Sequence, residues 1–306
     1  MKIKYGTRGS RLALHQTRHA ISVAQQCAPD SEFTEVVIKT LGDEVTNVPL
    51  FKVGGQGLFI KEIEHALLDG RIDVAVHSLK DMPHAMSPGL SILATGCLED
   101  ARDCFVSLKH ESFSALPAGA VIGTSSLRRR AQLASLRQDL QFSDFRGNLD
   151  TRLKKLEEGE VDAIILAAAG IHRFGWQQRI RHYFSLEEMT PPAGQGIIAI
   201  QCRSADIAML APVFASFADP IATSRAEAER AFLGVLQGGC TTPMAVHAEI
   251  AGDAVILHSF VGSVDGTRVI RNCHNGKIAQ AAELGRISAE AMLAAGAAEV
   301  IGAPHE

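Results

Sequence analysis

The stretch Ala120-Val121-Ile122-Gly123-Thr124-Ser125-Ser126-Leu127-Arg128-Arg129-Arg130 joins a short strand-like run to the start of a helix. Arginines in a first helical turn are unfavourable, because the helix N-terminus carries about half a positive charge. A nearby anion would offset that cost. Free backbone N–H groups, hydroxyls and guanidinium groups together form a site for a carboxylate or phosphate. The alternative is a solvated basic face with Thr124 or Ser125 as the N-cap.

Two other junctions between a strand and a helix have the same character. The first is Thr7-Arg8-Gly9-Ser10-Arg11, and the second is Arg146-Gly147-Asn148, with Arg152 one turn into the next helix. Three such junctions predict a ligand that carries several negative groups. For the second junction an alternative stays open, in which Asp150 is an ordinary first-turn acid and Arg152 pairs with Glu157.

The segment Val76-His77-Ser78-Leu79-Lys80-Asp81-Met82-Pro83 follows a buried strand. The carboxyl end of a parallel strand is where open α/β sheets bind their ligands. Lys80 and Asp81 would point apart if the segment were extended. Asp81 could also simply start a turn before Pro83, and the local sequence leaves both interpretations open.

Strand and helix patterns alternate through the first two thirds of the chain, which predicts parallel pairing within α/β domains. Residues 191–196 break this periodicity and are interpreted as a crossing between domains. From about residue 219 the pattern changes to a long helix over 224–237, three β-rich segments and an Ala-rich helix. This order predicts a separate α+β domain.

The 306 residues are enough for two or three domains, and the net charge of −4 argues against a general binder of nucleic acid or anionic membranes. Positive charge is nevertheless concentrated, since residues 101–183 hold 13 Lys and Arg against 9 Asp and Glu. The first residues lack the apolar core of a signal peptide, and no apolar run is long enough to span a bilayer. These features predict a cytoplasmic protein.

The six cysteines form no paired motif, so free thiols are expected. Five are expected to be small buried hydrophobes, whereas Cys240 lies in a loop after Gly238-Gly239. His15 and His19 have the spacing of metal ligands but lack a third ligand, so no metal is predicted. The run Gly54-Gly55-Gln56-Gly57 lacks the spacing of a phosphate-binding loop and is interpreted as a flexible lid.

Together these segments resemble the porphobilinogen deaminases, also called hydroxymethylbilane synthases, over nearly the whole chain. The resemblance is carried by residues 7–14, 76–83, 123–129, 146–148, 193–196, 229–233 and 238–240. It implies an α/β fold of two domains like those of periplasmic binding proteins, with mixed sheets around a cleft, and a small C-terminal α+β domain. The implied domains are residues 1–98 with 197–217, residues 99–196, and residues 218–306 with the Cys240 loop.

The resemblance also implies a transferase that condenses four porphobilinogen molecules head to tail, releases ammonia, and finally hydrolyses off the linear tetrapyrrole hydroxymethylbilane for haem biosynthesis. The chain would grow on a dipyrromethane cofactor that is bound to Cys240 through a thioether. Asp81 would be the catalytic residue, because an ionised carboxylate near the pyrrole N–H stabilises positive charge and assists proton transfer.

Each pyrrole unit carries acetate and propionate side chains, which explains the arginine-rich junctions. The cofactor-binding residues implied by the resemblance are Cys240, Lys80, Asp81, Thr124, Ser125, Ser126, Arg128, Arg129, Arg146, Gly147, Ala169 and Gly170. The implied substrate-binding residues are Arg8, Ser10, Gln16, Arg146, Arg152 and Arg173. The implied partner is porphobilinogen, with no nucleic acid and no membrane, and the enzyme is expected to be a monomer.

The sequence departs from the family pattern at three positions. Gln56 replaces a common lysine, which puts a cationic contact from the lid in doubt, Gln201 replaces a common glutamate, and His15 replaces a common tryptophan. Two other functions stay open. A solute-binding module would explain the arginines but would not need Asp81 or Cys240, and such modules generally carry an export signal. The effector domain of a transcription regulator would need a helix-turn-helix.

Overall fold

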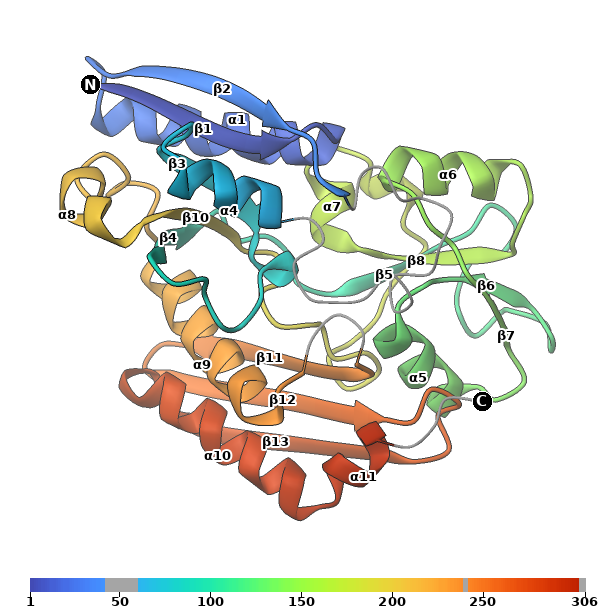
Figure 1. Cartoon of the computed structure of the whole chain (residues 1–306). Helices are drawn as coiled ribbons and strands as arrows, with labels where there is room; N and C mark the ends of the chain where they lie inside the picture. Colours follow the sequence, from blue (N-terminus) through green and yellow to red (C-terminus); the bar gives the residue numbers. More distant parts are fainter. Residues whose placement is uncertain (42–59, 239–241, 303–306) are drawn as a thin grey trace.

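The computed structural model describes residues 1–41, 60–238 and 242–302, which form three sheets with their own helices (Figure 1). Two sheets have five strands, and the third has three strands and lies in the C-terminal part of the chain. The predicted architecture of two mixed α/β units and a smaller α+β unit is therefore confirmed.

The first sheet has the order β2-β1-β3-β10-β4. Its strands are β1 (Lys2–Arg8), β2 (Glu32–Ile38), β3 (Val74–Ser78), β4 (Leu90–Gly96) and β10 (Ile198–Arg203). Strand β1 is parallel to β2 and β3, whereas β10 is antiparallel to β3 and β4. The helical segments of this unit are α1 (Arg11–Cys27), α4 (Lys61–Leu68), η1 (Leu79–Asp81), η3 (Ser204–Asp206) and α8 (Ile207–Leu210).

The second sheet, with the order β7-β6-β8-β5-β9, repeats this topology. Its strands are β5 (Asp103–Val106), β6 (Val121–Gly123), β7 (Gln141–Ser143), β8 (Ala163–Ala167) and β9 (His182–Tyr183). Its helical segments are α5 (Leu127–Leu136), α6 (Leu149–Glu157), α7 (Ala168–His172) and η2 (Gln177–Arg179). In each sheet the fourth strand, β10 or β5, is the antiparallel strand by which the chain enters from the other unit.

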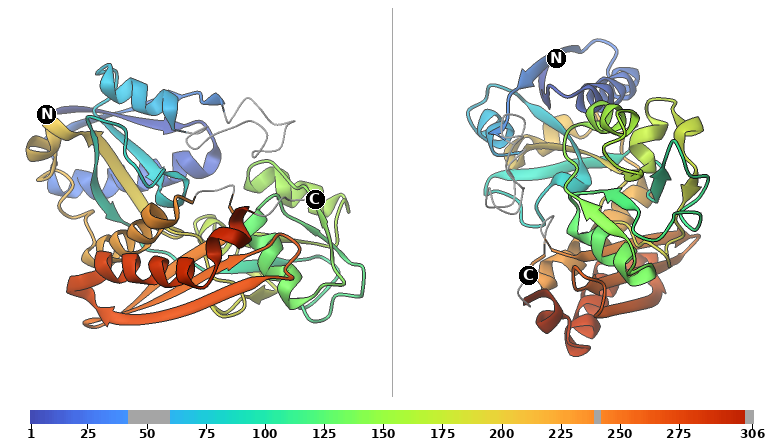
Figure 2. Two further views of the ribbon diagram at one scale, coloured as in Figure 1. Left: turned by 60° about the horizontal axis from the view of Figure 1, so that its bottom comes forward. Right: turned by 90° about the vertical axis from the view of Figure 1, so that its right-hand side faces the viewer.

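The third unit is an antiparallel meander covered by helices. Its elements are α9 (Pro220–Leu236), β11 (Met244–Ala251), β12 (Ala254–Gly262), β13 (Val269–Lys277), η4 (Ile278–Gln280), α10 (Ala281–Ala294) and α11 (Ala297–Gly302). Its core includes Phe232, Leu257 and Met292. Phe260 of β12 packs with Ala131 of α5, so this unit also lies against the second one (Figure 2). Burial of this apolar surface holds α5 against the C-terminal unit.

Two segments cross between the first two units, one from Gly96 to Asp103 and the other from Tyr183 to Ile198. They lie side by side where the N–H of Glu99 donates to the carbonyl oxygen of Gly196 at 3.0 Å. Gly196 has a φ of +88°, and a Cβ atom there would lie 2.4 Å from the Glu99 oxygen. Both the backbone conformation and the close approach require glycine.

We expect Gly196→Ala to destabilise the fold by about 3 kcal/mol, because it adds left-handed strain to a backbone clash. Gly252→Ala is the matched control. Gly252 has a φ of +59° but no heavy atom within 4 Å of a Cβ position. It carries only the left-handed cost, about 1 kcal/mol. Urea unfolding measures both variants, and equal losses would show that the crossing does not constrain residue 196.

Helix α9 begins earlier than the predicted residue 224. Pro220 occupies the first turn, and the Asp219 carboxylate accepts hydrogen bonds from the N–H groups of Ile221 (2.8 Å) and Ala222 (3.2 Å). An N-cap acid followed by proline is a standard helix start, so this signal was present in the sequence.

The cysteine prediction is wrong at two positions, since Cys27 and Cys273 are exposed, while Cys104 and Cys202 are buried. All five cysteines in the described ranges are free thiols. No helix within those ranges has the length and apolar character needed to cross a membrane.

Candidate functional site

The residues after β3 form one turn of 3₁₀ helix, η1, so Lys80 and Asp81 do not lie on extended backbone. The buried Leu79 anchors this turn among apolar side chains that include Ile197 and Ala222. The Lys80 ammonium donates a hydrogen bond to Oε1 of Gln195 at 3.1 Å. Its pKa is lowered to about 8, chiefly by burial and then by neighbouring arginines, while Asp81 opposes the shift.

A pocket beside Asp81 collects side chains from β1, α1 and β3. It is lined by Arg8, Ser10, Leu12, Ala13, Gln16, Ile60, Val76, His77, Ser78 and Asp81. Three predicted substrate residues, Arg8, Ser10 and Gln16, thus lie at one pocket with the predicted catalytic carboxylate. Gln16 is held by a 2.9 Å hydrogen bond from its Nε2 to the hydroxyl of Ser78.

His77 is a further residue of this pocket. Its Nε2 lies 3.0 Å from Oε1 of Gln201, whose Nε2 in turn donates to Glu64 at 2.8 Å. Burial lowers the pKa of His77 to about 4, so its imidazole is neutral near pH 7. Gln201 therefore lies between this neutral histidine and Glu64.

The three hydroxyls before α5 accept hydrogen bonds from backbone groups. Ser126 is the N-cap, and its Oγ accepts from the N–H of Arg129 at 3.4 Å. Oγ1 of Thr124 accepts from Ser126 at 3.2 Å, and Oγ of Ser125 accepts from Phe145 at 2.9 Å. The alternative with Thr124 or Ser125 as the N-cap is wrong. In these bonds each hydroxyl acts as an acceptor and retains its O–H as a donor.

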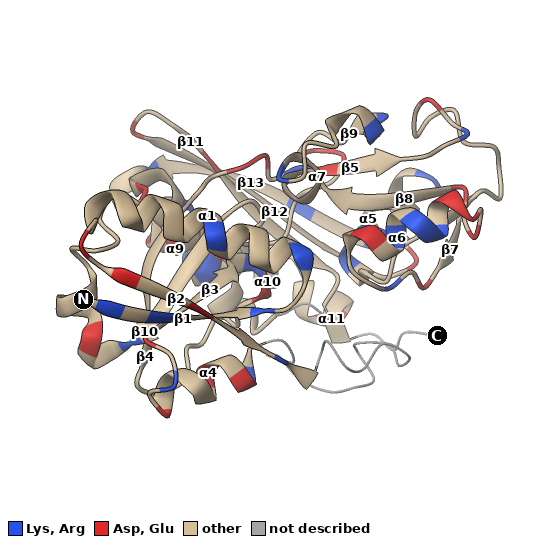
Figure 3. Ribbon diagram, turned by 90° about the horizontal axis from the view of Figure 1, so that it is seen from above, with Lys and Arg blue, Asp and Glu red and all other residues tan. Residues whose placement is uncertain are grey.

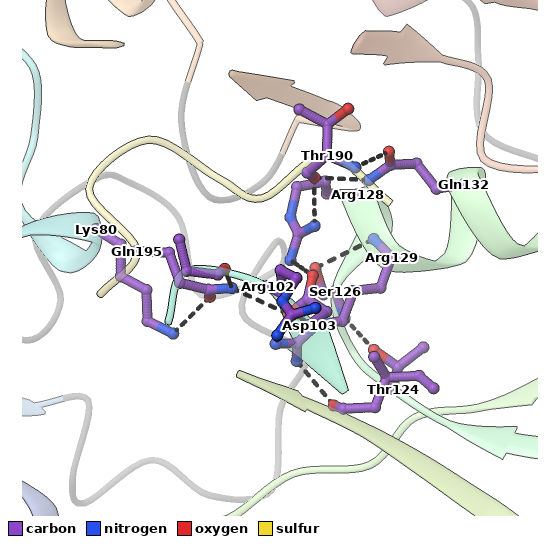
Figure 4. A network of polar contacts seen from close by, with 12 residues as sticks. Lys80, Arg102, Asp103, Thr124, Ser126, Arg128, Arg129, Gln132, Thr190 and Gln195 are labelled. Atoms are coloured by element: carbon purple, nitrogen blue, oxygen red, sulfur yellow. Dashed lines mark hydrogen bonds and ion pairs between the residues drawn. The ribbon is translucent and has the colours of Figure 1, made fainter. Parts of the chain in front are cut away.

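The first turn of α5 is buried, with Arg128 and Arg129 only 5% and 7% exposed. Both guanidinium groups contact Asp103, the first residue of β5 (Figure 4). Nη2 of Arg129 lies 2.6 Å from Oδ1, and Nη2 of Arg128 lies 2.7 Å from Oδ2. Arg129 also donates to the Ile165 carbonyl (2.9 Å), and Arg128 donates to the Thr190 carbonyl (2.8 Å). The alternative of a solvated basic face is wrong for these two arginines.

Asp103 is fully buried, and the two arginines determine its charge. Burial raises the pKa of Asp103, but Arg128 and Arg129 outweigh this effect, so its pKa lies far below the ordinary value. The group of Asp103, Arg128 and Arg129 therefore carries one net positive charge at neutral pH. The protein itself supplies part of the negative charge that the start of α5 requires.

Helix α6 provides a second group of cations. Asn148 is its N-cap, as predicted, and Oδ1 accepts from the N–H of Thr151 at 2.9 Å. Nε of Arg152 donates to the carbonyl oxygen of Gly147 at 2.9 Å. Glu157 instead pairs with Arg179 at 2.7 Å, so the alternative of an Arg152–Glu157 pair is wrong.

Arg152 lies near two other cations, Arg129 and Arg146. Its pKa is lowered to about 10, chiefly by burial and then by Arg129 and Arg146, and Asp81 only partly opposes this shift. Figure 3 shows basic segments on α1 and α6. An arginine pKa ordinarily exceeds 12, and most of this lowering comes from the removal of the guanidinium group from water, to which repulsion by Arg129 and Arg146 adds. The site has the electrostatics of a receptor for a ligand with several carboxylates.

Ala169 and Gly170 lie buried on α7. A Cβ atom at Gly170 would lie 3.9 Å from side chains of both Leu12 and Leu149, so this residue is next to α1 and α6. It therefore lies where the first and second units meet.

Arg173, which follows α7, is placed at the two crossing segments. Its Nη2 lies 3.4 Å from the carbonyl oxygen of Cys97 and 3.3 Å from that of Gly196. Burial lowers its pKa. Arg173 does not line the pocket beside Asp81, so the structure does not bring this predicted substrate residue together with Arg8 and Gln16.

Asp103, Gln195 and Glu229 are polar residues of the site that had no predicted role. Gln195 donates to Asp103 at 3.1 Å and to the Ala101 carbonyl at 2.7 Å. The buried Glu229 accepts from the N–H of Gly194 at 2.6 Å, which ties α9 to the crossing. Gln195 and Glu229 lie in segments that carried the resemblance. For Asp103 the available signal was an acid at the start of an apolar strand.

Cys240 and Gln56 lie outside the described residues. Within the described ranges no cluster of three or more His, Cys, Asp or Glu side chains could hold a metal ion. His15 packs against the ring of Phe174, with 5.9 Å between centroids.

Two family models match consecutive parts of the chain. Residues 3–211 match "Porphobilinogen deaminase, dipyromethane cofactor binding domain", and residues 223–294 match "Porphobilinogen deaminase, C-terminal domain". A curated porphobilinogen deaminase of Geobacter sulfurreducens is 42% identical over 300 residues, which cover 98% of this chain and 94% of that protein. The one of Syntrophus aciditrophicus is 45% identical over 294 residues, 96% of each chain.

The solved structures that align with this chain are more distant in sequence. Lipoprotein Tp32 of Treponema pallidum aligns with a TM-score of 0.47 at 12% identity over 71% of this chain and 90% of its own. A periplasmic substrate-binding protein of Coxiella burnetii aligns with a TM-score of 0.45 at 14% identity over 72% of this chain and 94% of its own.

Proposed function

Because the chain belongs to the porphobilinogen deaminase family, we propose that it condenses four porphobilinogen molecules head to tail, with release of ammonia, at the site beside Asp81. The enzyme is a transferase of the hydroxymethylbilane synthase class. The observation that carries the assignment of the site is that one buried carboxylate, Asp103, faces two buried guanidinium groups, Arg128 and Arg129, so the start of α5 keeps a net positive charge. A solute-binding module would use the same arginines but would need neither a thiol nor a carboxylate in addition.

The residues fit a dipyrromethane cofactor, because its acetate and propionate groups match this excess of guanidinium groups. When bound, the cofactor supplies the pyrrole carbon to which the first unit is joined. We assign its covalent attachment to the thiol of Cys240, since a thiolate is a good nucleophile for thioether formation. The residues proposed to hold its polar groups are Lys80, Asp81, Thr124, Ser125, Ser126, Arg128, Arg129, Arg146, Gly147, Ala169 and Gly170.

We assign substrate binding to cations on both sides of Asp81. Arg8, Ser10 and Gln16 line the pocket from the first unit. Arg146 and Arg152 act from the second unit, and Arg173 acts from the crossings. Guanidinium groups bind carboxylates through two parallel hydrogen bonds, which orients the incoming ring as well as attracting it.

We assign catalysis to Asp81. Loss of ammonia from the aminomethyl group of porphobilinogen leaves positive charge on the pyrrole ring, and an ionised carboxylate next to the ring N–H stabilises that charge. The same carboxylate can accept the proton that leaves when the new carbon–carbon bond is complete. Lys80 and the arginines bind the side-chain carboxylates and leave Asp81 as the anion for the ring.

Intact-mass measurement and peptide mapping of the purified protein test this function. We expect an adduct with the mass of two pyrrole units on Cys240 and, after addition of porphobilinogen, species heavier by successive units. Cys240→Ala is expected to abolish both the adduct and turnover, whereas Cys273→Ala, which alters an exposed free thiol, serves as the control. A parent protein that stays unmodified with porphobilinogen present would identify a binding module instead.

The pKa of Lys80 predicts how substrate affinity depends on pH. Its lowered value of about 8 means that the ammonium loses its charge as pH rises through 8, whereas the carboxylates of the substrate stay ionised. We therefore expect KM for porphobilinogen to increase between pH 7 and pH 9. Lys80→Arg should remove this increase, because the guanidinium stays charged over the whole range. An unchanged pH profile in that variant would exclude Lys80 as the titrating group.

We also propose that the enzyme is a cytoplasmic monomer that binds neither nucleic acid nor membranes. The net charge of −4 supports the part of this proposal that excludes binding to nucleic acid and anionic membranes. The domain boundaries 1–98 with 197–217, 99–196 and 218–306 stay predictions. Light scattering at micromolar concentration tests the oligomeric state, and limited proteolysis tests the boundaries.

A further inference from the structure

We propose that Asp103 is a positioning residue of the reaction, which holds Arg128 and Arg129 in a fixed orientation toward the ligand and is connected through Gln195 to Lys80. The inference rests on the proposed role of these cations in binding carboxylates. It adds a buried acid that contacts neither the substrate nor the dipyrromethane cofactor, which is the primer of the growing chain. This acid acts through the arginines that bind them.

Asp103 contacts one edge of the Arg129 guanidinium group. Arg129 donates from Nε and Nη2 to Oδ1 of Asp103, at 3.1 and 2.6 Å, and from Nη1 to the Ile165 carbonyl. These bonds use three of the five N–H groups of an arginine. The remaining two, one on each terminal nitrogen, suit a carboxylate of the ligand.

Arg128 is fixed in a similar way. Nη2 makes a close ion contact with Oδ2 of Asp103 at 2.7 Å, without a well-aligned hydrogen bond, and Nη1 donates to the Thr190 carbonyl. That carbonyl is itself fixed, since Gln132, one helical turn after Arg128, donates to it at 3.0 Å. Gln132 also accepts from the N–H of Thr190 at 2.8 Å. Two adjacent arginines are thus held by rigid groups, Arg129 through hydrogen bonds and Arg128 through one hydrogen bond and one close ion contact.

Asp103 also has an electrostatic effect on the two arginines. Two buried guanidinium groups on consecutive residues repel each other, and a buried charge without a partner is costly. The single carboxylate of Asp103 contacts both. It reduces the charge of the group from two to one, which allows the arginines to stay side by side and still attract an anion.

Gln195 connects Asp103 to the catalytic turn. Nε2 of Gln195 donates to Asp103, and Oε1 of the same amide accepts from Lys80 (Figure 4). A second bond from Nε2 to the Ala101 carbonyl fixes which side of the amide faces each partner. Asp103 is the first residue of β5 in the second sheet, and Lys80 follows β3 of the first sheet. The chain of contacts therefore sets the distance between cations on the two units.

A double-mutant cycle between Asp103 and Arg129 tests the inference. We expect Asp103→Asn and Arg129→Gln each to slow primer loading or raise KM by about 10- to 100-fold, as for a misplaced binding group. In loaded molecules kcat should change much less. The double variant should be no worse than Arg129→Gln alone, because Asp103 acts through the arginines. The readouts are the intact mass during loading and steady-state kinetics of the loaded enzyme.

Asp139→Asn is the matched control, since Asp139 is an exposed carboxylate paired with Arg137 at the surface of the same unit. It should load and bind like the parent. If Asp103→Asn fails to fold, the double variant, which removes one charge of each sign, still gives the comparison with Arg129→Gln. Two outcomes would overturn the inference but not the proposed function. In one, the losses of the two single variants multiply in the double variant. In the other, Asp103→Asn has normal primer loading and a normal KM. Normal loading and KM in Arg129→Gln would overturn the proposed role of Arg129 and the inference with it.

Discussion

Asp81→Ala is expected to reduce kcat by about 10³- to 10⁴-fold and to leave the primer attached, because among the described residues that line the pocket it removes the only carboxylate and no cation. Removal of a negative charge from a positive site does not weaken attraction of an anionic substrate. KM should therefore be unchanged or lower, and the loss should appear in kcat, as expected for a group whose interaction strengthens in the transition state.

Two further variants separate charge from shape in this prediction. Asp81→Asn retains the size of the side chain and one oxygen acceptor, so an equal loss of kcat would show that the charge matters. Asp69→Ala removes an exposed carboxylate at the end of α4 in the same unit and should leave kcat unchanged. The measurement is steady-state ammonia release by protein whose primer load has been checked by mass. A near-normal rate in Asp81→Ala would refute the assignment of Asp81.

The elements with strong local signals could be predicted from the sequence. Ser10 and Asn148 are N-caps whose partners, Ala13 and Thr151, lie three residues away. A capping interaction of this kind is visible in any short window of sequence. The alternation of strand and helix likewise predicted the α/β units, because apolar periodicity is also a local property.

The contacts that define the site are not local, and the sequence predicted them only in part. Two arginines at a helix start indicated a missing anion, but Asp103 lies 26 residues before Arg129 and begins a strand without a predicted role. Strand β5 pairs with β8 and β9, which come much later in the chain. No short window of sequence contains such pairings, so neither this strand nor its acid could be placed.

The difference between the extended conformation considered from the sequence and the observed turn at Lys80 has the same cause, a contact between distant parts of the chain. The 3₁₀ turn at Lys80 is fixed by Gly194, where a Cβ atom would lie 2.8 Å from the Lys80 nitrogen. That contact joins positions more than 100 residues apart. The sequence could indicate that residues 76–83 belong to a ligand site, but the choice between extended and turn conformation depended on the distant crossing.

The buried position of Arg128 predicts two separable effects of its replacement. Arg128→Leu should destabilise the fold by about 3 kcal/mol, because Asp103 loses one of its two buried cations. It should also slow primer loading by about 100-fold or more, because the guanidinium fork for a carboxylate is gone. Urea unfolding measures the first effect, and intact mass during incubation with porphobilinogen measures the second.

Arg128→Lys distinguishes ligand binding from a purely structural role. Lysine retains the positive charge beside Asp103, so most of the stability should return, but an ammonium cannot serve the carboxylate, the Thr190 carbonyl and a ligand with the same planar geometry. Loading should therefore stay slow in a protein that unfolds nearly like the parent. Arg130→Leu is the control on the same helix, since Arg130 is exposed and lies over the ring of Phe142 at 5.5 Å. If Arg128→Lys loads at the parent rate, the planar fork of Arg128 is not needed to bind the primer, and its contribution is charge alone.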